Sequence, residues 1–106
     1  MNSLLLFYDN SGDKYYIPTN NIQRVYRVDT DTVRIVTNVF AHDNNTHSRY
    51  LCYDVEDATA LGVADTTQSQ SIIDAWGKAL ASSSSIITVE LASPILDIVT
   101  CQETWV

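Results

Sequence analysis

The run Leu4–Phe7 limits the fold of this chain more than any other feature, because all four of its residues are apolar. Alternate residues of a β-strand point to opposite sides of its sheet, so a strand over Ser3–Tyr8 is apolar on both faces. The run Ile95–Cys101 has the same character. Strands of this kind are normally covered on both sides, so the chain needs two layers of cover.

One segment predicts a helix, at about residues 68–82. Its apolar residues recur at helical spacing and form one face: Ile72, Ile73, Trp76, Ala79 and Leu80. Thr67 and Gln70 have the Thr-x-x-Gln form of a capping box, which predicts where the helix begins. We expect Trp76 to be the structural anchor that fixes the helix on the sheet. One helix of this length covers only one face of a small sheet.

The rest of the chain predicts strands joined by turns. Asp9–Asp13 is rich in residues that favour tight turns, so the first strand and a second at Lys14–Ile17 form a hairpin. Pro18 lacks an N–H and therefore suits an edge strand or a bend. The remaining strands are predicted by runs of β-branched and aromatic residues at Ile22–Val28, Val33–Val39, Arg49–Val55, Ile86–Leu91 and Ile95–Cys101.

These elements predict a mainly β fold of the α+β class in a single domain, residues 1–106. We expect an antiparallel bent sheet or a small, partly open barrel, with one amphipathic helix. In size and strand richness the chain resembles Sm-like and SH3-like barrels. The glycine and asparagine pattern of the Sm motifs is absent and the helix comes late in the chain, so the resemblance concerns architecture alone.

Three arrangements would cover the sheet face that the helix leaves exposed. The sheet curls and encloses its own face, a second copy of the chain covers it, or a loop such as Ala58–Asp65 lies across it. The first two arrangements are compatible with each other. We therefore expect a homo-oligomer, with the number of subunits left open.

The hairpin between the third and fourth predicted strands brings arginines together. With the loop Asp29–Thr32, Val28 lies opposite Val33, and Arg27 therefore lies opposite Arg34. Like charges that face each other across strands are destabilising, so this pair needs an anionic partner.

Two interpretations of these arginines remain open. The functional one is a site for an anion, such as a phosphate or single-stranded nucleic acid, and its candidate residues are Arg24, Tyr26, Arg27 and Arg34. The other is neutralisation by a carboxylate of the chain, such as Asp29, Asp31 or Asp54, and we favour it because acidic side chains outnumber basic ones.

Charge and composition restrict the function. Six basic and 13 acidic residues give a formal net charge of -7. This charge argues against a protein that coats duplex DNA and against one that binds membranes through a polybasic surface. No apolar run reaches the roughly 20 residues of a membrane span, and no secretory signal is recognisable. We expect a cytoplasmic protein with both cysteines, Cys52 and Cys101, free and buried.

No motif of catalysis or cofactor binding is present. The chain lacks Gly-x-Ser-x-Gly, Cys-x-x-Cys, His-Glu-x-x-His and a phosphate-binding glycine loop. His42 and His47 flank a polar segment, but their spacing does not define a metal site. We therefore expect a non-enzymatic module that associates with itself, without metal or cofactor. The alternative is a binder of anionic ligands or single-stranded nucleic acid through the arginine-bearing hairpin.

Overall fold

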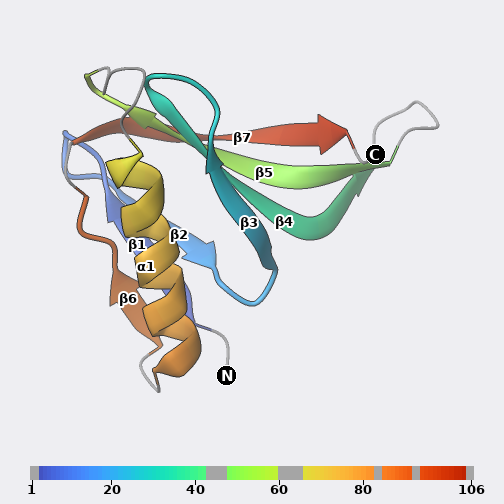
Figure 1. The fold of residues 1–106 in the computed structure, drawn as a ribbon, viewed down its shortest axis with the longest axis horizontal. Coiled ribbons are helices and arrows are strands. Elements are labelled where there is room, and N and C mark those ends of the chain that lie inside the picture. The colour runs from blue at the N-terminus through green and yellow to red at the C-terminus, as the bar shows by residue number, and fades with distance from the viewer. Residues whose placement is uncertain (1–2, 43–47, 60–65, 83–84, 92–93, 105–106) are drawn as a thin grey trace.

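The computed structural model describes residues 3–42, 48–59, 66–82, 85–91 and 94–104. Within these ranges the chain forms seven strands and one helix (Figure 1). Their order is β1 (Leu4–Tyr8), β2 (Lys14–Pro18), β3 (Ile22–Arg27), β4 (Thr32–His42), β5 (Ser48–Asp57), α1 (Thr67–Ala81), β6 (Ile86–Thr88) and β7 (Ile95–Thr104). The fold is mainly β with a single helix, as the sequence predicts.

The strands form two bent sheets. The small sheet has the order β2-β1-β6, in which β1 is antiparallel to β2 and parallel to β6. The larger sheet has the order β3-β4-β5-β7, and all its neighbours are antiparallel. Neither sheet closes on itself, as Figure 1 shows. The mainly β fold with bent antiparallel sheets is confirmed, and the sheets do not close into a barrel.

The two sheets and the helix share one hydrophobic core. The small sheet contributes Leu5, Phe7 and Ile17; the larger sheet contributes Val25, Val33, Ile35 and Val55; the helix contributes Ile72, Ala75 and Ala79. α1 contacts β1, β6 and β3, and Figure 1 shows it lying along one face of the small sheet. The inner face of each sheet is therefore the face that meets this core.

The hairpin turn between β1 and β2 forms as its composition predicts. The side-chain oxygen Oδ1 of Asp9 accepts hydrogen bonds from the backbone N–H groups of Ser11 and Asp13, each at 2.9 Å. Gly12 occupies the left-handed region at φ 88°, which a residue without a Cβ adopts at little cost. β2 ends at Pro18 and is an edge strand, as expected from its missing N–H.

The helix is rotated relative to the predicted face. Its buried residues are Gln68, Ser69, Ile72, Ala75 and Ala79. Ile73 and Leu80, which were predicted to face the core, are 36% and 67% exposed. Small side chains on the buried face let α1 pack closely, and the buried Gln68 donates a hydrogen bond from Nε2 to Oδ1 of Asp57 at 2.6 Å. Hydrophobic periodicity cannot predict this polar contact, because it records only apolar residues.

Two further details of the helix prediction are the capping box and the position of Trp76. The capping box is wrong, because the N-cap is Thr66 and no side-chain cap hydrogen bond is present there, while Gln70 donates to Asp74 instead. Trp76 packs at the margin of the core and is partly buried. Its role as the anchor of the helix stays a prediction. Within the described part of the chain, no helix has the length and apolar character needed to span a bilayer.

The β3–β4 hairpin forms, but with a register one residue away from the predicted one. Tyr26 is the partner of Arg34, and Arg27 is the partner of Val33. The reason lies in the turn, where the N–H of Val28 donates to the carbonyl of Thr32 and shortens the loop to three residues. The predicted Arg27–Arg34 pair is therefore wrong. A shift of one residue moves side chains to the opposite face, so Tyr26 now shares a face with Arg34.

Candidate functional site

A network of charged side chains lies on the face of the larger sheet opposite the core, and Arg34 is at its centre. Arg34 and Asp54 are register partners on β4 and β5. The guanidinium donates from Nε to Oδ1 of Asp54 at 2.8 Å and from Nη2 to Oδ2 at 3.1 Å. These hydrogen bonds are the main cause of the raised pKa of Arg34. The two parallel contacts fix the guanidinium plane.

Glu103 extends the network across the whole sheet. It lies on β7, yet its carboxylate accepts hydrogen bonds from Tyr26 and Arg24 on the opposite edge strand β3. Arg34 adds a third contact, from Nη1 to Oε2 at 3.5 Å. A flat four-stranded sheet would hold its edge strands about 14 Å apart. Glu103 reaches β3 because the sheet bends toward this face.

The network covers apolar residues beneath it. Val36 and Cys52 are completely buried, although they do not belong to the main core. In the strand register they form one row with Arg24 and Cys101. The long stem of an arginine shields apolar surface while its charged head stays partly in water. The second face of the larger sheet is thus covered by its own side chains.

The charges within the network balance. Two guanidinium groups face two carboxylates, which are those of Asp54 and Glu103. Desolvation raises the pKa of Glu103, but hydrogen bonds from Tyr26 and Arg24 outweigh it and hold that pKa below its ordinary value of 4.5. The guanidinium of Arg24 also lies 4.6 Å from the centre of the Tyr26 ring. The network offers no excess positive charge to a phosphate.

Three of the four predicted anion-site residues come together here. Arg24, Tyr26 and Arg34 belong to the network, whereas Arg27 donates from Nε to the backbone carbonyl of Asp29 at 2.9 Å. The sequence offers Asp54, on a neighbouring strand, as a neutralising partner. It does not point to Glu103, because 69 residues separate Glu103 from Arg34 and no local pattern links them. Whether these residues bind an anion stays a prediction.

The small sheet carries a second candidate surface on its outer face. Alternation along β1 sends Leu5 and Phe7 into the core and the residues between them outward. The strand register then collects a set of mostly apolar side chains, which we call the outer apolar face: Leu4, Leu6, Tyr8, Tyr16, Pro18 and Ile86. Lys14 lies at its margin, with Nζ 5.9 Å from the centre of the Tyr8 ring.

The outer apolar face is incompletely covered. Leu6, at its centre, is buried, but Tyr8, Tyr16 and Ile86 are 44%, 48% and 46% exposed. Contiguous apolar surface of this kind often marks an interface. The loop proposed from the sequence as a cover, Ala58–Asp65, lies from residue 60 onward outside the described residues.

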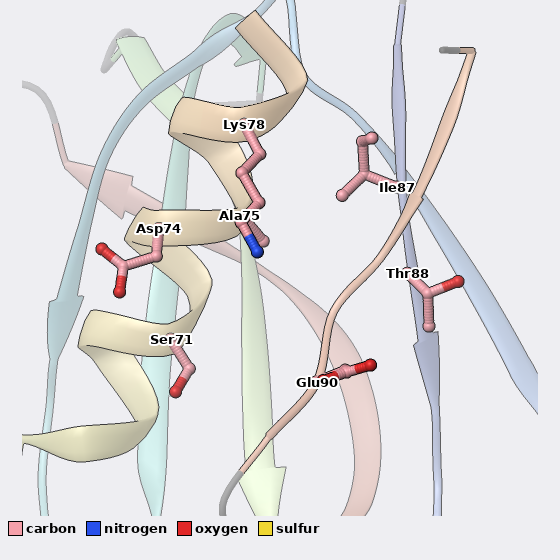
Figure 2. A pocket seen from close by; sticks show the side chains of 7 residues that line it. All are labelled: Ser71, Asp74, Ala75, Lys78, Ile87, Thr88 and Glu90. Atoms are coloured by element: carbon pink, nitrogen blue, oxygen red, sulfur yellow. The ribbon is translucent and has the colours of Figure 1, made fainter. Parts of the chain in front are cut away.

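A groove between α1 and β6 is the third candidate. Its volume is about 300 Å³, and its lining residues are Ser71, Asp74, Ala75, Lys78, Ile87, Thr88 and Glu90. Figure 2 shows the amine of Lys78 pointing into the space between helix and strand, while Asp74 points away from the strand. Ala75 and Ile87 supply an apolar floor, and the rim is charged. The hydroxyl of Ser71 donates to the carbonyl of Thr67 at 2.9 Å.

The structure does not describe the side chains of the two histidines of the chain. His47 lies outside the described residues, and of His42 only the backbone is described. Among the described residues, no group of three or more histidine, cysteine, aspartate or glutamate side chains could hold a metal ion.

An unfavourable pair of carboxylates lies on the same face of the larger sheet as the Arg34 network. Glu56 on β5 is the register partner of Asp97 on β7. Desolvation, followed by the charges of Asp97 and Asp31, raises the pKa of Glu56. A carboxyl whose pKa is raised by folding destabilises the folded state when it is ionised.

We therefore expect Glu56→Gln to stabilise the protein by about 0.5 kcal/mol near neutral pH. The gain should disappear as the pH falls through the raised pKa of Glu56, because the wild-type carboxyl is then protonated in the folded state. Urea denaturation at several pH values measures this. Glu90→Gln makes the same chemical change at an exposed position and should alter stability little at any pH. A Glu56→Gln protein no more stable than wild type near neutral pH would contradict the expectation.

Comparison with known proteins gives no relative: no protein-family model matches the chain, and no curated protein or solved structure resembles it detectably.

Proposed function

We propose that this protein is a non-enzymatic interaction module that associates with a second copy of itself through the outer apolar face. The observation that carries the proposal is the exposure of Tyr8, Tyr16 and Ile86 on one face of a sheet whose other face packs against the core. Apolar residues alternate with core residues along β1, so this face cannot turn inward without removing Leu5 and Phe7 from the core.

A second copy suits this face in its chemistry. In a two-fold dimer the same residues of both copies meet, so a charged centre would bring like charges together. The outer apolar face has no charged residue at its centre, and Lys14 lies at the margin. Tyrosine tolerates such a place because its ring is apolar and its hydroxyl can stay in contact with water. Two sheets would then pack face to face at about 10 Å.

Anion or nucleic-acid binding is the less favoured function. Arg24 and Arg34 already have carboxylate partners, so a phosphate would have to displace Glu103 or Asp54. The formal net charge of -7 adds long-range repulsion. A cytoplasmic location also stays a prediction, and cysteines outside any disulfide are in keeping with a reducing compartment.

Sedimentation velocity over a wide range of protein concentrations tests the proposal. We expect a reversible monomer–dimer equilibrium that persists at high salt, because its driving force is apolar. Tyr16→Glu places a charge on the outer apolar face and should shift the protein to monomer. Circular dichroism and thermal melting establish that this variant is folded.

Leu80→Glu is the matched control, because Leu80 is an exposed apolar residue on α1, away from the outer apolar face. We expect this variant to associate like the wild type. A wild-type protein that stays monomeric at every concentration would refute the proposal, as would dimers that Leu80→Glu disrupts and Tyr16→Glu does not. Dimers that dissociate with rising salt and also bind a single-stranded oligonucleotide would favour the arginine-bearing hairpin instead.

A further inference from the structure

The two cysteines of the chain are direct neighbours across the strands of the larger sheet. Cys52 on β5 and Cys101 on β7 are register partners in an antiparallel pair, and neither is in a disulfide. Directly opposed residues of such a pair have Cα atoms about 4.5 or about 5.5 Å apart. Disulfides join residues whose Cα atoms are roughly 4.4–6.8 Å apart. Either Cα spacing therefore falls within the range that a disulfide spans.

The two thiols differ in access. Cys52 is completely buried, and its thiol donates a hydrogen bond to the backbone carbonyl of Tyr50 at 3.4 Å. Cys101 is partly exposed. A reagent in solution therefore reaches Cys101 more readily than Cys52, which lies beside it on the neighbouring strand.

The charged groups around the pair come from three strands. Asp54 on β5 and Arg34 on β4 lie beside Cys101, and Glu103 on β7 faces Cys52. Burial raises the pKa of both thiols, and Cys52 and Asp54 contribute to raising that of Cys101 to about 12. Both cysteines are therefore protonated near neutral pH. Because the thiolate is the reacting form, their reaction is slow there and accelerates as the pH rises.

We propose that Cys52 and Cys101 are an oxidation site, which closes to an intramolecular cross-strand disulfide by exchange with a low-molecular-weight disulfide. The thiolate of Cys101 attacks one sulfur of the reagent, breaks its S–S bond and releases one small thiolate. The thiolate of Cys52 then attacks the sulfur of Cys101 and releases the second one. The two protons of the cysteines end on the two released thiolates. The protein loses two electrons, and the reagent gains them as it becomes two thiols.

The disulfide would tie the edge strand β7 to β5 covalently. Glu103 follows Cys101 by two residues, so the bond fixes the part of β7 that reaches across the sheet to Arg24 and Tyr26. Closing a loop from residue 52 to residue 101 also restricts the unfolded chain. We therefore expect the melting temperature of the oxidised protein to rise by on the order of 10 °C.

The experiment treats the folded protein with oxidised glutathione and follows free thiols, intact mass and mobility without reductant. The expected product has no free thiol, is lighter by two hydrogen atoms and migrates as a monomer, and dithiothreitol restores both thiols. Its rate of formation should rise about tenfold per pH unit, since the thiolate fraction does so below the pKa.

Single-cysteine variants separate the two steps. Cys52→Ala should stop at a stable glutathione adduct on Cys101, whereas Cys101→Ser should leave the buried Cys52 unmodified while the protein is folded. The proposal is overturned if the wild type accumulates a glutathione adduct without closing, if it forms disulfides between two molecules, or if it reacts only in denaturant. The wild-type measurement decides the matter even if a variant does not fold.

Discussion

Phe7→Ala is expected to lower the free energy of unfolding by about 3–5 kcal/mol. Phe7 is completely buried in the core that the two sheets and the helix share. Removing its ring takes away apolar burial and leaves a cavity that the closely packed neighbouring side chains fill only in part. A loss of this size is a large part of the total stability of a domain, so the urea midpoint of this variant should fall far below that of the wild type.

Tyr8→Ala is the control for this prediction, because Tyr8 is the next residue of the same strand and points to the outer apolar face. It is 44% exposed, so its truncation should change the stability of the dilute protein much less. At high concentration the same variant should associate more weakly than the wild type. Equal losses of stability for the two variants would contradict the arrangement of β1, in which one face is packed and the other is open.

Asp54→Ala has the second largest expected effect, a loss of about 2–3 kcal/mol in the free energy of unfolding. The change removes both hydrogen bonds from Arg34 to Asp54, and of the carboxylate contacts of that guanidinium it leaves the longer one to Glu103. The loss is smaller than for a fully buried pair because the side chain of Arg34 is 22% exposed and water can partly replace the carboxylate. Urea denaturation measures it.

Removing both charges is the matched control. The double variant Arg34→Met, Asp54→Leu keeps long apolar side chains over Val36 and Cys52 and leaves no unpaired guanidinium. It should regain much of the stability that Asp54→Ala loses, because an uncompensated charge costs more than a missing ion pair. A double variant as unstable as Asp54→Ala would indicate that Asp54 acts through contacts other than Arg34.

Local patterns in the sequence predict most elements of this fold. The turn at Asp9–Asp13, the edge position of β2 and the β3–β4 hairpin follow from residues close in sequence, whose preferences the structure obeys. The need for cover on both faces of β1 also follows from alternation alone. The sequence also offers Asp54 on a neighbouring strand as a partner for the arginines of the hairpin, and the structure pairs it with Arg34.

Other features depend on contacts that no local pattern records. The loop of the hairpin is one residue shorter than its composition suggests, and that difference decides which face Tyr26 occupies. The helix buries its small residues together with Gln68, because Gln68 donates a hydrogen bond to Asp57 on β5. Glu103 joins the network only because the sheet bends, which is a property of all four strands together.

The parallel pairing of β1 with β6 has a consequence for the growing chain on the ribosome. Leu4 finds its partner Ile86 only after the intervening residues have been synthesised. Until then one edge of β1 keeps its hydrogen-bonding groups open to other extended chains. Pairings between distant segments also form slowly. The nascent polypeptide therefore passes through a period of vulnerability to aggregation, during which a chaperone that shields this early hairpin would raise the yield of native molecules.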